Sequence, residues 1–133
     1  MSDYTLSTTV QQPYDETVAA VKAGLAEQGF GVLTEIDLAA TLHAKIGATV
    51  PPQVILGACR PQLAYEALQA DPSVATVLPC NVVVRTVDAT TTAVEAFDPA
   101  AMTGMSGAGE GSPLDRVATD ARQRLGALLD ALA

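Results

Sequence analysis

Two cysteines carry the most distinctive chemistry in this chain. Cys59 stands immediately before Arg60, and Cys80 immediately before Asn81. Thiolates are nucleophiles and ligands for soft metal ions, and two neighbouring thiols can also exchange with a redox partner. We therefore expect a binding or sensing site built on a Cys59/Cys80 dithiol, with a soft metal ion or a thiol-reactive molecule as its candidate ligand.

The predicted strands and helices indicate how the two thiols would meet. Cys59 ends one predicted strand, a helix begins at Pro61, and Cys80 begins the next strand. If the two strands are antiparallel neighbours, the sulfurs lie close together. A helix N-terminus and a nearby cation both lower the pKa of a thiol. Arg60 is therefore expected to lower the pKa of Cys59, and the Asn81 amide to form a hydrogen bond at the site.

Two other functions fit the same residues. An enzyme could use Cys59 as its nucleophile or redox thiol, with Glu35 or His43 as the base. Alternatively, the domain is structural or binds proteins, and both cysteines are small core hydrophobes, since free cysteine is among the most buried residue types. The cysteines do not form a C-x-x-C unit, and a closed zinc site would need two more ligands.

The remaining titratable candidates also have structural interpretations. His43, the single histidine, lies off the apolar stripe of a short predicted helix and is expected to be solvated. Glu35 and Asp37 share one face of a predicted strand, a spacing that could pair two carboxylates for acid–base work. Asp37 directly precedes Leu38-Ala39-Ala40, so we assign it as the helix N-cap.

A glycine-rich stretch near the C-terminal helix contains two further patterns. Met102 and Met105 have the M-x-x-M spacing of thioethers that hold copper(I). In such a loop they are better interpreted as hydrophobic plugs or as disordered residues. The segment from Gly107 to Gly111 resembles a phosphate cradle, but it lacks the G-x-x-x-x-G-K pattern. Glu110 would also repel an anion, so we reject a nucleotide site there.

Composition excludes several classes of partner. The chain has 133 residues, with 15 Asp and Glu against 7 Lys and Arg, and a net charge of −8. Such a surface does not favour nucleic acid or an anionic membrane, because both require clustered cations. No apolar run approaches the roughly 18 residues of a membrane span. The N-terminal residues do not resemble a signal peptide, so we expect a cytoplasmic protein with reduced thiols.

Hydrophobic periodicity predicts a single α+β domain over residues 1–133. The expected order is strand, helix, strand, short helix, strand, helix, two strands joined as a hairpin, and a final helix. The sheet is mainly antiparallel, and the first and last helices cover one face. Valines on the other face indicate burial in an oligomer, most simply a homodimer. Residues 99–111 are predicted to form a mobile loop.

The expected strands include residues 4–10, 32–37, 54–59, 81–87 and 91–97. In the second of these, we expect Val32, Thr34 and Ile36 to share one face. The final helix begins at Ser112-Pro113-Leu114-Asp115, a capping-box pattern with Asp in place of the usual Glu. Asp120 and Arg124 are one helical turn apart and can pair on its exposed face.

Three motifs resemble the domain of unknown function family 302, a group found widely in bacteria and archaea. They are Gly29-Phe30-Gly31-Val32-Leu33-Thr34-Glu35-Ile36-Asp37, Ile55-Leu56-Gly57-Ala58-Cys59-Arg60-Pro61 and Leu78-Pro79-Cys80-Asn81-Val82-Val83-Val84. The resemblance runs from Tyr4 to about Pro99. It implies a β-α-β4-α fold of the TATA-binding-protein-like type and a homodimer. The helix predicted from Pro61 is then an insertion between the third and fourth strands. It implies no biochemical activity, and Arg60 departs from the asparagine usual in the family.

Overall fold

Five antiparallel strands form one sheet in the order β1-β5-β4-β3-β2. The structure, a computed structural model, describes residues 3–106 and 109–133. Consecutive pairs in that order are all antiparallel, and β4 and β5 form the predicted hairpin. The strands are β1 (Thr5–Val10), β2 (Gly31–Asp37), β3 (Gln53–Cys59), β4 (Cys80–Asp88) and β5 (Thr91–Phe97).

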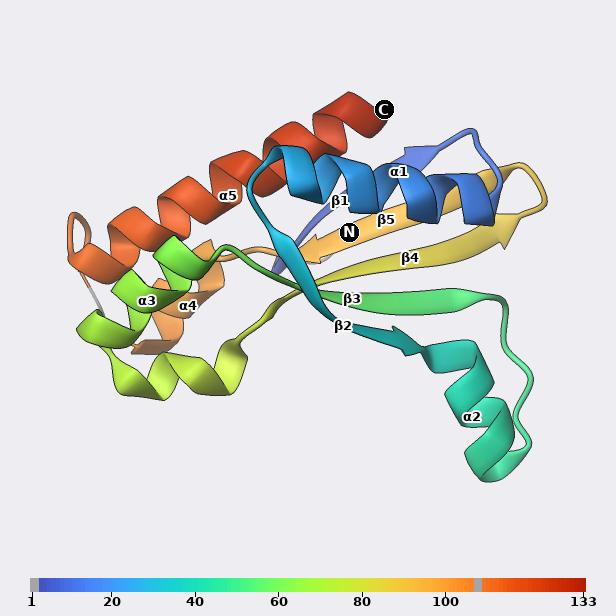
Figure 1. Cartoon of the computed structure of the whole chain (residues 1–133), viewed down its shortest axis with the longest axis horizontal. Helices are drawn as coiled ribbons and strands as arrows, with labels where there is room; N and C mark the ends of the chain where they lie inside the picture. The colour runs from blue at the N-terminus through green and yellow to red at the C-terminus, as the bar shows by residue number, and fades with distance from the viewer. Residues whose placement is uncertain (1–2, 107–108) are drawn as a thin grey trace.

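Two helices cover one face of the sheet, as predicted. These are α1 (Tyr14–Glu27) and α5 (Pro113–Leu132), which run across the strands at the top of Figure 1. Fully buried leucines and valines from both layers form the main core between them. They include Val21, Leu25, Leu56, Val84 and Leu125. The α+β class and the β-α-β4-α order are therefore confirmed.

Local sequence signals explain where the helices begin and end. The Ser112 hydroxyl accepts a hydrogen bond from the backbone N–H of Asp115 at 3.1 Å, which confirms the predicted cap of α5. Asp37 likewise caps α2 (Leu38–Ile46), accepting from the N–H of Ala40 at 2.9 Å. Gly47 ends that helix with φ of 71°, a left-handed conformation that favours glycine.

Three short helical segments form a second packing unit beyond one end of the sheet. They are α3 (Pro61–Ala70), the 3₁₀ helix η1 (Pro72–Val77) and α4 (Ala100–Ser106), which lie beside the N-terminal half of α5 in Figure 1. Leu63, Met102, Leu114 and Val117 are buried in this second core. The inserted helix expected between the third and fourth strands is α3 together with η1.

The prediction of a mobile loop over residues 99–111 is wrong for the first half of that range. Residues Ala100–Ser106 form α4. Asp98 accepts a hydrogen bond from the N–H of Ala100 at 3.0 Å and so caps the start of this helix. The helix is too short to show an apolar periodicity in the sequence. Met102 is 4% exposed, which fits the interpretation as a hydrophobic plug. Residues 107–108 of the rejected phosphate cradle lie outside the described residues.

The prediction that Val32, Thr34 and Ile36 share one face of β2 is also wrong. Val32 pairs with Ala58 and Thr34 pairs with Gly57, so Leu33 is an extra residue in a β-bulge. The bulge shifts the alternation by one residue. Thr34 and Ile36 then share a face that is opposite to that of Val32.

The segment that contains the bulge projects from the molecule. We call residues 31–53 the arm: it contains β2, α2 and the connection to β3, and no residue in it is buried. In Figure 1 the arm reaches away from the helical layer at the lower right. The arm therefore contributes no side chain to the buried core.

The helices of the described residues include none long and apolar enough to cross a lipid bilayer.

Candidate functional site

A small apolar pocket lies where the ends of β3 and β4 meet α3, α4 and α5. Cys59, Cys80 and Met102 border it together with Arg60 and the aliphatic side chains of both cores. Its volume is about 20 Å³, which is about the space needed for one water molecule. The two predicted cysteines and one predicted methionine are therefore among the residues that border this pocket.

Cys80 belongs to the buried side of this pocket. It pairs with Ala58 across the β3–β4 ladder, and it is 8% exposed. Loss of hydration, and to a smaller extent the nearby Cys59, raises the pKa of its thiol to about 11. Cys80 is therefore a neutral thiol at physiological pH.

Cys59 has a different environment, although it borders the same pocket. It follows Ala58 along β3, so strand alternation directs its side chain to the opposite face from that of Cys80. The thiol is half-buried, and burial raises its pKa. β3 and β4 are antiparallel neighbours as predicted, but both cysteines are free and do not face each other as a dithiol.

Arg60 does not play the predicted electrostatic role. Its Nη1 donates to Oε1 of Gln62 at 3.0 Å. The guanidinium lies close to the turn after α1, where a Cβ added at Gly29 would approach Arg60 Nε to 3.0 Å. That Nε is buried and has no hydrogen-bond partner among the described residues. The expected lowering of the Cys59 pKa by Arg60 is thus wrong, because desolvation raises it instead.

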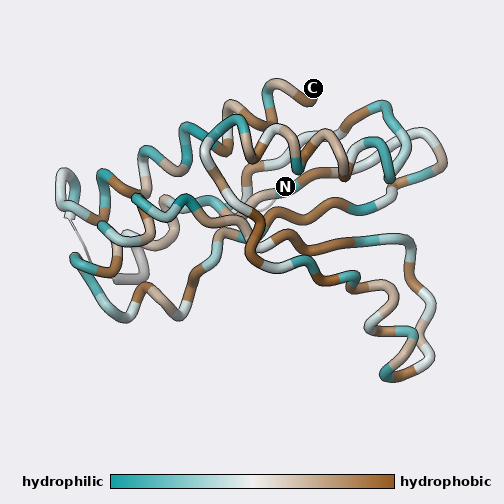
Figure 2. Tube along the Cα trace, viewed as in Figure 1, coloured by the Kyte–Doolittle hydropathy of each residue, from teal (hydrophilic) through white to brown (hydrophobic). Residues whose placement is uncertain are grey.

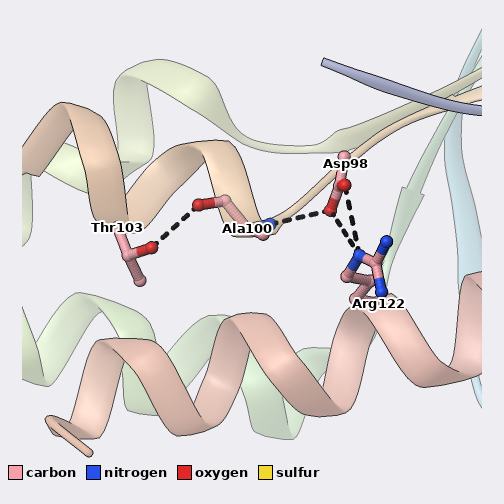
Figure 3. A network of polar contacts seen from close by, with 4 residues as sticks. All are labelled: Asp98, Ala100, Thr103 and Arg122. Carbon is pink, nitrogen blue, oxygen red and sulfur yellow. Dashed lines mark hydrogen bonds and ion pairs between the residues drawn. The ribbon is translucent and has the colours of Figure 1, made fainter. Parts of the chain in front are cut away.

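Met102 is the third sulfur at the pocket, and α4 carries it there. A polar network anchors this helix, as Figure 3 shows. The Asp98 carboxylate accepts two hydrogen bonds from Nε of Arg122 in α5, both at 3.1 Å. Inside α4, the Thr103 hydroxyl donates to the carbonyl of Ala100 at 2.8 Å. The network ties the start of α4 to α5 and so fixes the position of Met102.

The other predicted site residues lie away from the pocket. The Glu35 carboxylate forms an ion pair with Lys22 of α1 at 2.7 Å. His43 is exposed in the last turn of α2, on the arm. Asn81 is exposed and borders a shallow groove that also contains Tyr4 and Glu95. The structure therefore does not assemble Glu35 or His43 with Cys59 as a catalytic base.

No sequence pattern links Met102 with the cysteines, because α4 is too short to show an apolar periodicity. Its M-x-x-M spacing with Met105 was the available signal for a soft-metal ligand. Within the described residues, no cluster of three or more His, Cys, Asp or Glu side chains could hold a metal ion. A metal ion with three side-chain ligands at this pocket would therefore need the thioether of Met102 in addition to the two thiols.

Comparisons with known proteins agree with this architecture. The crystal structure of the uncharacterized conserved protein DUF302 from Bacillus stearothermophilus is 30% identical and superposes with a TM-score of 0.87. The match covers 99% of this chain and 100% of that chain. No curated protein matches the sequence. The family model for the domain of unknown function DUF302 matches residues 6–132. The chain belongs to the DUF302 family.

Proposed function

We propose that this protein is a small binding or sensing domain that takes a soft metal ion at the pocket bordered by Cys59, Cys80 and Met102. One observation carries the proposal: three sulfur side chains, from β3, β4 and α4, border one apolar pocket. Thiolate and thioether sulfurs together select soft ions such as copper(I) over hard ions such as magnesium.

The size of the pocket favours an ion over an organic ligand. Pockets for drug-sized molecules have volumes of roughly 300–1,000 Å³, whereas this one has about 20 Å³. Binding of a single ion by both thiols would require the Cys59 side chain to turn toward Cys80, because strand alternation directs the two to opposite faces. A thiol-reactive molecule would have to reach the half-buried Cys59 first.

Proton release is part of the proposed binding reaction. Burial raises the pKa of both thiols, so both are protonated in the free protein near neutral pH. A metal ion must displace one proton from each thiol that it binds. Affinity should therefore rise with pH, and each bound ion should release up to about two protons.

The raised thiol pKa values argue against the enzyme alternative. A nucleophilic or redox cysteine needs an accessible thiolate with a lowered pKa. Cys59 has a raised pKa, and neither Glu35 nor His43 lies at the pocket. The structural alternative, in which both cysteines only fill the core, predicts no selective metal binding.

A competition titration tests the proposal. Reduced protein is titrated with copper(I) against a chromogenic chelator, and Cys59→Ser, Cys80→Ser and Met102→Leu are compared with the unaltered chain. We expect one ion per chain and a loss of at least about tenfold in affinity for each cysteine variant. Equal weak binding by all four proteins would establish the core role of the cysteines and overturn the proposal.

The proposal includes the cytoplasm as the compartment, because its reducing conditions keep both thiols free.

A further inference from the structure

A groove lies between α3 and the first turn of α5, apart from the sulfur pocket. Its volume is about 490 Å³, within the roughly 300–1,000 Å³ typical of sites for small molecules. It shares no lining residue with the pocket at Cys59 and Cys80. The groove is lined by Tyr65, Glu66, Gln69 and Ala70 of α3 and by Pro113 and Arg116 of α5.

Both helices present polar side chains at the groove because each buries its apolar face elsewhere. Leu63 of α3 and Leu114 of α5 are buried in the second core, whereas Glu66 and Arg116 are exposed. Figure 2 shows hydrophilic and hydrophobic segments alternating along α5, and in Figure 1 α3 lies beside the start of this helix. The folding of the second core therefore holds the two walls of the groove in place.

Arg116 brings to the groove a guanidinium that forms no ion pair within the described residues. Its Nη1 donates to the carbonyl of Gly111 at 2.8 Å. The neighbouring Asp115 carboxylate accepts from the N–H of Gly111 at 2.9 Å instead of pairing with Arg116. In contrast, Arg85 and Arg122 each form an ion pair with a carboxylate. The remaining N–H donors of Arg116 are therefore available to a ligand.

Glu66 brings the opposite charge to the same groove. Within the part of the chain that the structure describes, its carboxylate has neither a hydrogen bond nor an ion pair, so it does not pair with Arg116. Tyr65 is 65% exposed, and its ring and Pro113 supply apolar surface beside the charges. Two opposite charges thus line one groove without neutralising each other.

We propose that this groove binds a free α-amino acid with an apolar side chain. The Arg116 guanidinium donates to the ligand carboxylate, which its planar fork matches. The Glu66 carboxylate accepts hydrogen bonds from the ligand ammonium group, and the Tyr65 ring contacts the ligand side chain. This activity is additional to metal binding at the sulfur pocket.

Net charge favours a zwitterion over other small ligands. The chain carries a net charge of −8, so it repels a dicarboxylate or a phosphate. An amino acid has no net charge and avoids this repulsion. A simple amine is attracted to the acidic chain but leaves the Arg116 guanidinium without a partner.

An NMR titration of the whole chain, labelled with nitrogen-15, tests the proposal with L-phenylalanine as the ligand. Saturable shifts should be confined to the amides of α3 and the first turn of α5. N-acetyl-L-phenylalanine lacks the ammonium charge, and L-phenylalanine methyl ester lacks the carboxylate. Each should bind at least about tenfold more weakly, because each leaves one charge of the groove unpaired. Equal affinities for the three compounds, or no saturable shift in these two helices, would overturn the proposal.

Matched variants separate the groove from the overall charge of the chain. Arg116→Gln and Glu66→Gln should each weaken binding of L-phenylalanine by at least about fivefold, since each removes a charge-assisted hydrogen bond. Lys45→Gln on α2 and Glu27→Gln on α1 remove the same charges at other exposed positions, and they should leave the affinity unchanged within about twofold. Equal weakening by the groove variants and their controls, or unchanged binding by Arg116→Gln, would overturn the proposal.

Discussion

Cys80 pairs with Ala58, and not with Cys59, in the ladder between β3 and β4. This offset of one residue gives the two thiols different environments. Cys80 points into the core and is buried, whereas Cys59 is half-buried at the end of its strand. The two cysteines therefore have separable chemistry, although they border one pocket with Met102.

Stability at alkaline pH should depend on Cys80. Its pKa is about 11 in the folded chain and about 8.5 in an unfolded chain. The neutral buried thiol therefore contributes stability that is complete below about pH 8.5 and is lost as pH rises toward 11. Urea unfolding of the reduced protein should show this decline, and Cys80→Ala should lose most of it.

Cys59→Ala is the control for this measurement. Burial also raises the pKa of Cys59, but that thiol is only half-buried, so the variant should retain most of the decline above pH 8.5. The same pH dependence in the unaltered chain and in Cys80→Ala would contradict the assignment of a neutral buried thiol.

Gly57 should tolerate no side chain. A Cβ added there would lie 2.1 Å from the Thr34 Oγ1 and 2.7 Å from Cγ of Pro79. The Thr34 hydroxyl can rotate, but the proline ring cannot move without shifting the chain before Cys80. We expect Gly57→Ala to lower the free energy of unfolding by about 1–3 kcal/mol through overpacking, as measured by urea titration.

Gly126→Ala is expected to raise the free energy of unfolding, in contrast to Gly57→Ala. Gly126 lies in α5, and a Cβ there would meet nothing within 4 Å. Replacing a helical glycine by alanine at such a position should stabilise the protein by about 0.5–1 kcal/mol. A destabilisation by Gly126→Ala as large as that by Gly57→Ala would contradict the packing described at β3.

Asp98 should matter more for stability than an exposed ion pair does. Its side chain is 13% exposed, and it caps α4 and accepts from Arg122. Asp98→Ala should lower the free energy of unfolding by about 1–2 kcal/mol, because a cap and a charge-assisted bond are lost together. It should also weaken copper(I) binding, since α4 positions Met102.

Asp120→Ala serves as the comparison. The predicted pair between Asp120 and Arg124 is present at 2.7 Å on the partly exposed face of α5. Removal of such a helical pair typically costs about 0.2–0.5 kcal/mol. Equal destabilisation by Asp98→Ala and Asp120→Ala would show that the network in Figure 3 does not anchor α4.

Local patterns in the sequence predict most of the fold. Alternating apolar residues and turn residues such as Asp88 define the strands and the β4–β5 hairpin. The caps at Asp37 and Ser112 were also predictable, because a side-chain acceptor at that position satisfies a free backbone N–H.

The site is less predictable, because it depends on register and on long-range packing. A shift of one residue reverses the face of a side chain, and the sequence does not define the register of β3 against β4. For this reason the prediction of a facing dithiol fails, while the prediction that the two strands are neighbours holds. The contact of Met102 with the pocket depends on α4 docking on α5, which joins segments distant in the chain.

We propose that sulfur side chains at this pocket hold a soft metal ion. X-ray absorption of the copper(I)-loaded, selenomethionine-substituted protein tests it most directly, because copper–sulfur and copper–selenium scattering are distinct. We expect a sulfur shell that is reduced in Cys59→Ser and Cys80→Ser, and a selenium contribution that is lost in Met102→Leu. A metal shell made only of oxygen or nitrogen, unchanged in these variants, would contradict the account.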